Sequence, residues 1–88
     1  MLDVSEGGAP GITAFVLMIV ELGQEYEIAR KAKELYPSEV REVHVTYGEY
    51  DIVIKVEVKS LRDLDRVVTG LRGIPGVKTT TTLISSGA

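Results

Sequence analysis

The stretch Val45-Thr46-Tyr47-Gly48-Glu49-Tyr50-Asp51-Ile52 lies near the middle of the chain, between two runs rich in β-branched residues. It holds the only glycine in a long central span, two of the four tyrosines and an acidic pair. A tight turn on Gly48 would bring Tyr47, Tyr50 and Asp51 together at one end of a sheet. We therefore expect this turn to form half of a small-molecule site, with the other half supplied by a second copy of the chain.

The residues on either side of this turn predict a β-hairpin. Upstream, Val40–Tyr47 alternates between apolar and polar positions, with Val43 one residue out of step. Downstream, Ile52–Val58 alternates cleanly. Alternation of this kind is typical of strands with one buried face. The two series in the downstream strand are Ile52, Ile54, Val56 and Val58 against Val53, Lys55, Glu57 and Lys59.

The rest of the chain adds a strand and a helix before the hairpin and a helix and a strand after it. The first helix is predicted from apolar residues at helical spacing, among them Tyr26, Ile28 and Ala32. The second is predicted from an N-cap serine and a glycine-proline stop. The predicted segments are a strand over Thr13–Leu22, a helix from Gln24 that ends before Pro37, a helix between Ser60 and Gly73, and a strand over Val77–Ser85.

The β-α-β-β-α-β order places the chain in the α+β class. It is typical of the ferredoxin-like sandwich, a four-stranded antiparallel sheet with two helices on one face. Residues 1–11 are rich in glycine and contain Pro10, so they predict a flexible tail. Residues 86–88 predict a short C-terminal tail. One domain over residues 12–85 remains.

The first strand is apolar on both of its faces, which a strand covered on one side alone would not need. In a ferredoxin-like sandwich the second face of the sheet has no helices. We therefore expect another subunit to cover it, giving a dimer through the sheets. The two series in this strand are Phe15, Leu17 and Ile19 against Ala14, Val16, Met18 and Val20.

Composition narrows the function classes. The 88 residues are 44% hydrophobic and 26% charged, as in an ordinary small globular domain. The net charge of −3 and the absence of a basic cluster argue against direct contact with nucleic acid. The longest apolar run, Ala14–Val20, is too short to span a bilayer. No signal peptide is visible and there is no cysteine, so we expect a cytoplasmic protein without disulfides.

No catalytic motif is present, and we expect the chain not to be an enzyme. His44 is the only histidine, so a metal site has no support, and no cofactor is expected. The glycine series Gly70-x-x-Gly73-x-x-Gly76 lies at a helix end and is a stop signal, not a dinucleotide-binding loop.

The acidic pair and a threonine run allow two interpretations each. Asp51 could face a ligand ammonium while amides near Gly48 meet a carboxylate, or it could only hold the turn through backbone hydrogen bonds. Thr80 and Thr82 share one face of the last strand, and Thr79 with Thr81 the other. Their hydroxyls could bind a small polar ligand, or the run could be only a polar edge strand.

Four segments together resemble a known family. They are Thr46-Tyr47-Gly48-Glu49-Tyr50-Asp51, then Ile52-Val53-Ile54-Lys55-Val56, then Leu61-x-x-Leu64, then Ile74-Pro75-Gly76-Val77-x-x-Thr80-x-Thr82. At this separation they resemble the RAM domain, the effector-binding domain of the leucine-responsive regulator (Lrp)/AsnC family. The likeness covers roughly residues 12–85. The chain resembles a stand-alone RAM domain, without the helix-turn-helix domain that precedes it in the family's regulators.

The resemblance implies dimers that assemble into rings, often octamers, with amino-acid effectors bound between dimers. It also makes full-length regulators of the family candidate partners. A purely structural assembly domain, an ACT-like amino-acid sensor with Gly23 at its ligand turn, and a small enzyme on the same sandwich stay open as alternatives. The site residues that the resemblance implies are Tyr47, Gly48, Tyr50 and Asp51 of the hairpin turn, with Thr80 and Thr82 contributed by a neighbouring chain.

Overall fold

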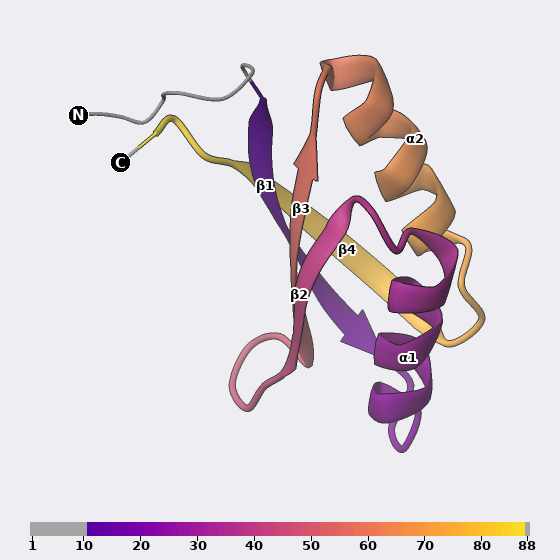
Figure 1. The fold of residues 1–88 in the computed structure, drawn as a ribbon. Coiled ribbons are helices and arrows are strands. Elements are labelled where there is room, and N and C mark those ends of the chain that lie inside the picture. The colour runs from indigo at the N-terminus through magenta and orange to yellow at the C-terminus, as the bar shows by residue number, and fades with distance from the viewer. Residues whose placement is uncertain (1–10, 88) are drawn as a thin grey trace.

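The fold is a single four-stranded sheet with two helices packed on one of its faces, seen in a computed structural model that describes residues 11–87 (Figure 1). This confirms the predicted βαββαβ sandwich. The predicted N-terminal tail, apart from Gly11, and Ala88 lie outside the described residues. The elements are β1 (Ile12–Val20), α1 (Glu25–Leu35), β2 (Val40–Val45), β3 (Ile52–Val58), α2 (Leu61–Arg72) and β4 (Val77–Ile84).

The sheet has the strand order β2-β3-β1-β4, and every neighbouring pair is antiparallel. β1 is central, as its continuous apolarity predicts, and is shorter than predicted. It ends at Val20, because Glu21 and Leu22 belong to the turn that leads to Gly23 at φ 87°. A positive φ of this kind is easy only for glycine. β4 and β2 are the two edges of the sheet.

One face of the sheet forms the hydrophobic core with the two helices. Residues of β1 and β3 that face the helices have little or no exposed surface, as alternation predicts. α1 and α2 add their apolar stripes to this layer. The largest fully buried side chains are Met18, Ile28, Ile52, Ile54, Leu71, Val16, Val56 and Val67.

A bulge in β2 explains why Val43 is out of step in the sequence. Val40 pairs with Val56, but Glu42 pairs with the next residue of β3, Lys55. Arg41 is therefore one residue too many for the ladder, which is the definition of a β-bulge. The extra residue lets both Val40 and Val43 contribute to the helix-covered side, although regular alternation would place residues three positions apart on opposite faces.

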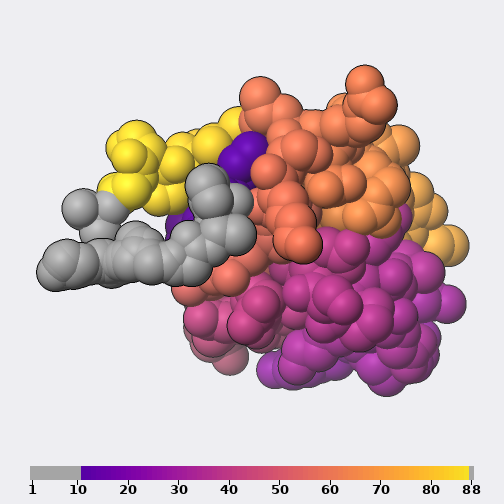
Figure 2. Space-filling view, turned by 45° about the horizontal axis from the view of Figure 1, so that its top comes forward, coloured from indigo at the N-terminus to yellow at the C-terminus, as the bar shows by residue number. Residues whose placement is uncertain are grey.

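Two residues of the α2 segment have clear local roles. Ser60 caps α2, since its Oγ accepts a hydrogen bond from the Asp63 amide at 3.1 Å, as predicted. Gly70 makes room for the side chain of Tyr36, the residue that follows α1: a Cβ at position 70 would lie 1.7 Å from the Tyr36 hydroxyl oxygen. In the space-filling view the segment around α1 lies directly against α2 (Figure 2).

The helix-free face of the sheet, called the open face below, carries both apolar and charged side chains. Phe15 and Leu17 of β1 and Val53 of β3 are only half-buried there. The prediction that β1 is apolar on both faces is confirmed. The side chains of the open face, placed by the strand register, are Thr13, Phe15, Leu17, Ile19, Glu42, His44, Val53, Lys55, Glu57, Thr79, Thr81 and Leu83.

Candidate functional site

The segment between β2 and β3 is a wider loop than the tight turn expected on Gly48. β2 ends at Val45, and the Thr46 amide donates to the Asp51 carbonyl oxygen at 2.9 Å, so four residues protrude beyond this closing pair. The Thr46 hydroxyl donates to the Tyr50 carbonyl oxygen at 2.7 Å and fixes the loop from inside. Gly48 has φ 115°, which a residue with a Cβ rarely adopts.

The backbone amides at the tip of this loop are available to a ligand. Within residues 11–87, the structure gives no hydrogen-bond acceptor for the amides of Tyr47, Gly48 or Glu49. A Cβ built on Gly48 would meet nothing within 4 Å. Unpaired backbone amides are groups with which a protein can bind a carboxylate or another anion.

Asp51 ties the loop to the end of β1. Its Oδ2 accepts a hydrogen bond from the Val20 amide at 2.9 Å, and its own amide donates to the Met18 carbonyl oxygen at 2.8 Å. This favours the interpretation in which Asp51 holds the turn, with a partner 31 positions away in sequence. A carboxylate has two oxygens, so the hydrogen bond to Val20 leaves acceptor capacity for a ligand ammonium as well.

A pocket of about 510 Å³ opens between this loop and the start of α1. Three residues predicted for the site, Tyr47, Gly48 and Asp51, line it together. The carboxylates of Glu25 and Asp51 contribute negative charge, and none of the eight lining residues is cationic. The loop pocket, as it is called below, is lined by Leu22, Glu25, Tyr26, Val45, Thr46, Tyr47, Gly48 and Asp51.

The rim of the loop pocket exposes large side chains. Leu22 is 94% exposed, Tyr26 is 77% exposed and Tyr47 is fully exposed. The expectation that Tyr26 belongs to the buried stripe of the first helix is wrong, because it lies in the first turn of α1, beyond the core residues Ile28 and Ala32. Exposed apolar side chains gathered around one hollow mark an interaction or ligand site more often than chance exposure does.

Leu22, Glu25 and Tyr26 are the site residues that sequence reasoning missed. They come from the β1–α1 turn and the start of α1, about 25 residues from the loop in sequence, and meet the loop only through folding. A local signal existed only for the exposure of Leu22, not for its place beside the loop. Leu22 precedes a glycine and follows the acidic Glu21, so it falls outside the strand's buried series.

Tyr50 lies on the other side of the loop. Its hydroxyl donates to Thr81 Oγ1 at 3.4 Å, and Thr81 belongs to the open face because it pairs with Leu17. Tyr50 is therefore not among the residues that line the loop pocket. Thr81, which was not predicted for the site, is its partner.

The threonines alternate as predicted, and the structure adds which face each pair occupies. Thr80 pairs with Met18, and Thr82 with Val16, so both lie on the helix-covered face. Neither lines the loop pocket of its own chain. Their predicted role requires a second chain.

Two negative findings apply to residues 11–87. No helix there is long and apolar enough to cross a membrane. In the same part of the chain, no three His, Asp or Glu side chains gather closely enough to hold a metal ion.

The described part of the chain is thus a ferredoxin-like sandwich with a pocket beside its β2–β3 loop. The family model described as the Lrp/AsnC ligand binding domain matches residues 13–87. The chain therefore belongs to the Lrp/AsnC ligand-binding domain family, as the sequence resemblance implied.

Similar proteins include regulators of this family. The HTH-type transcriptional regulator FL11 of Pyrococcus horikoshii is 38% identical over 71 residues, which are 81% of this chain and 46% of that protein. The chain thus spans about half the length of the curated regulators it matches. Escherichia coli AsnC is 31% identical in structural superposition, with a TM-score of 0.73 over 88% of this chain and 52% of that one.

Shorter solved chains match almost end to end. The crystal structure of FFRP-DM1 is 43% identical, with a TM-score of 0.77 over 84% of this chain and 97% of that one. A different kind of match is partial: 43 residues, 49% of this chain, are 44% identical to a segment that makes up 9% of homocitrate synthase from Sulfolobus acidocaldarius.

Proposed function

We propose that the chain is an amino-acid-binding regulatory and oligomerisation module that takes its effector in the loop pocket. The observation that carries this proposal is the juxtaposition of unpaired amides around Gly48 with the carboxylate of Asp51 in one pocket. An α-amino acid presents a carboxylate and an ammonium on one carbon. The amides suit the first group, and Asp51 suits the second.

The rim residues suit the remainder of such a ligand. Leu22, Tyr26 and Tyr47 offer apolar surface that a side chain can cover. A family relative supports the ligand class. A feast or famine regulatory protein from M. tuberculosis, solved in complex with L-methionine, is 25% identical, with a TM-score of 0.66 over 88% of this chain and 51% of that one.

A second copy would complete the site. Thr80 and Thr82 are remote from the loop pocket of their own chain, so a contribution from them requires a neighbour. We infer a dimer through the open face, where Phe15, Leu17 and Leu83 would be buried. Dimers would then join near the exposed rim of the loop pocket into a higher oligomer, an octamer-like ring, with the effector between them.

The module would act without chemistry of its own. We expect it to work in the cytoplasm and to contact no nucleic acid directly, because its net charge is −3. Its effects would pass through assembly, with itself or with full-length regulators of the family. The partial likeness to homocitrate synthase fits a portable regulatory module, since it covers only a small part of that enzyme.

Thermal-shift and calorimetric titration with the standard amino acids test the proposal. The matched variants are Asp51→Asn and Asp65→Asn. The carboxamide of Asp51→Asn can still accept the hydrogen bond from Val20 but carries no charge, so folding should survive while the affinity for the effector falls about tenfold or more. Asp65 is a weak control, because it lines a shallow hollow beside Thr82, so Glu34→Gln on α1 is added: Glu34 is exposed, lines neither the loop pocket nor that hollow, and its replacement should leave effector binding unchanged.

One alternative has an observation in its favour. Because Asp51 already bonds to Val20, the loop could serve only structure, in a pure assembly domain. In that case no amino acid raises the melting temperature even at millimolar concentration, and the oligomer persists in Asp51→Asn. An ACT-like sensor would instead depend on Gly23, so Gly23→Ala would abolish effector binding in a folded protein.

A further inference from the structure

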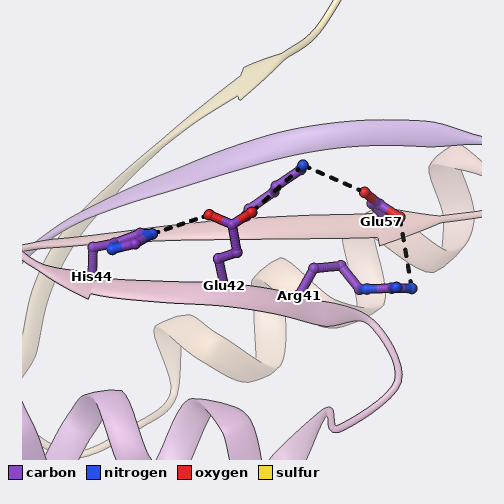
Figure 3. A network of polar contacts seen from close by, with 5 residues as sticks. Arg41, Glu42, His44 and Glu57 are labelled. Atoms are coloured by element: carbon purple, nitrogen blue, oxygen red, sulfur yellow. Dashed lines mark hydrogen bonds and ion pairs between the residues drawn. The ribbon is translucent and has the colours of Figure 1, made fainter.

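The open face is divided into two halves of different character. The half made by β1 and β4 is apolar or neutral, with Phe15, Leu17 and Leu83 at its centre. The half made by β2 and β3 carries ionisable side chains that form one connected group (Figure 3). This charged cluster consists of Arg41, Glu42, His44, Lys55 and Glu57.

Ion pairs link the members of the charged cluster in a chain. His44 Nε2 lies 3.0 Å from Glu42 Oε1, and Lys55 Nζ lies 3.7 Å from both Glu42 Oε2 and Glu57 Oε2. Arg41 Nη1 lies 3.7 Å from Glu57 Oε1 (Figure 3). The hydrogen bond from His44 and the charge of Lys55 keep the pKa of Glu42 below its usual value.

The charges of the cluster balance only while His44 is neutral. Two carboxylates, Glu42 and Glu57, face two permanent cations, Arg41 and Lys55, so the sum is zero. A proton on His44 adds a third positive charge without a third carboxylate. Among the described strands, no third carboxylate on this face compensates it, because β1 has no charged residue and β4 has no acidic one.

We propose that His44 makes the pairing of two copies through the open face depend on pH, with the dimer weakened when His44 takes up a proton. This inference rests on the proposed function, in which a second copy covers the open face. His44 is 60% exposed in the single chain, and water solvates its charge there. In a two-fold dimer the same face would be covered, and each copy would bring one net positive charge into it, because Glu42, the partner of His44, is already shared with Lys55.

The direction of the effect is set by the cost of covering an ion. Covering an ion costs free energy unless a partner charge offsets it, so the dimer should bind fewer protons at His44 than two separate chains do. Its dissociation constant should then rise as the pH falls into the range in which histidine side chains take up protons. Because a dimer has two copies of His44 and so can take up at most two protons there, the dissociation constant can change by at most a factor of about 100 per pH unit.

Sedimentation equilibrium of the full chain at fixed ionic strength, without amino acids, from pH 8 to pH 5.5 measures this effect. We expect the dimer dissociation constant to rise at least about tenfold between pH 7.5 and pH 5.5. His44 is the only histidine, and free carboxylates titrate near pH 4, below this range. Circular dichroism at each pH confirms that the chain stays folded.

Two variants test whether the pH dependence of dimerisation comes from His44. His44→Gln cannot take up a proton and should dimerise equally at both ends of the range. His44→Lys carries a permanent charge and should be weakened even at pH 8. A flat wild-type profile, or a pH response that persists in His44→Gln, overturns the inference. A chain that stays monomeric at pH 8 at every concentration instead overturns the covering of the open face, and the inference with it.

Discussion

The two faces of the sheet use the same strands under different constraints. On the helix-covered face, Val16, Met18 and Ile54 have no exposed surface. On the open face, their neighbours Leu17 and Val53 stay half-buried, beside a cluster of charges. The first face is therefore complete within one chain, whereas the second leaves an apolar half on β1 and β4 and a charged half on β2 and β3 open to solvent.

The largest expected effect on the free energy of unfolding comes from truncating a side chain to alanine on each face of the sheet. Ile54→Ala removes a fully buried side chain and should lower the free energy of unfolding by about 2–5 kcal/mol. Val53→Ala, one residue away on the open face, should cost less in the isolated chain. Urea denaturation at low protein concentration measures both. Equal losses would show that the two faces do not differ as described.

The helix layer that completes the covered face offers a second test. Gly70→Ala places a methyl group against the end of the Tyr36 side chain, so Tyr36 must move out of its place, at about 1–3 kcal/mol. Gly73→Ala is the matched control, because the nearest atom to its new Cβ lies 3.5 Å away. Chemical denaturation of the pair reports the difference. If Gly70→Ala is as stable as Gly73→Ala, the packing of Tyr36 over Gly70 contributes nothing to stability.

The open face should respond in assembly more than in folding. Leu17→Ser removes apolar surface from its centre and should raise the dimer dissociation constant about tenfold, or about 1.4 kcal/mol. Leu35→Ser is the control, because Leu35 is 50% exposed and lies on α1. Sedimentation equilibrium of both variants measures their dimer dissociation constants. Dimers unchanged by Leu17→Ser would place the contact between copies elsewhere.

The smallest expected effect concerns an ion pair outside both faces. Arg66 donates to Glu39 at 2.9 Å, and this hydrogen bond lowers the pKa of Glu39. A carboxyl whose pKa is lowered by folding stabilises the fold above its unfolded pKa and loses that contribution as the pH falls through its folded pKa. In Glu39→Gln the melting temperature should therefore fall slightly less steeply than in the wild type as the pH drops below about 4.5. Thermal melts of both proteins from pH 7 to pH 3 measure this dependence. The same pH dependence in both would contradict the expectation.

The sequence predicted the element order well because each element carries its own local pattern. Alternation marks β3, an N-cap serine marks the start of α2, and a continuous apolar run marks β1. The same patterns placed Thr80 and Thr82 together on one face. Alternation along a strand shows which residues share a face, but not which of the two faces the helices cover. The structure was needed to assign the helix-covered face.

The site was predicted in part, for a physical reason. Tyr47, Gly48 and Asp51 share a pocket because they are neighbours in one loop. The contributions of Leu22 and Tyr26 depend on where the β1–α1 turn packs, which no local pattern encodes. The hydrogen bond from Val20 to Asp51 is likewise a long-range contact, so the anchoring role of that carboxylate could only be offered as one alternative.

The bulge at Arg41 has a consequence for how this strand can vary in length. Without Arg41 the strand would read Val40, Glu42, Val43, His44, Val45, a strict alternation that needs no irregularity. Arg41 therefore behaves as a one-residue insertion that the edge strand absorbs while every core position is kept. Between relatives, a gap of one residue at this place would be a neutral difference, whereas the same gap in β1 or β3 would exchange the two faces of the sheet.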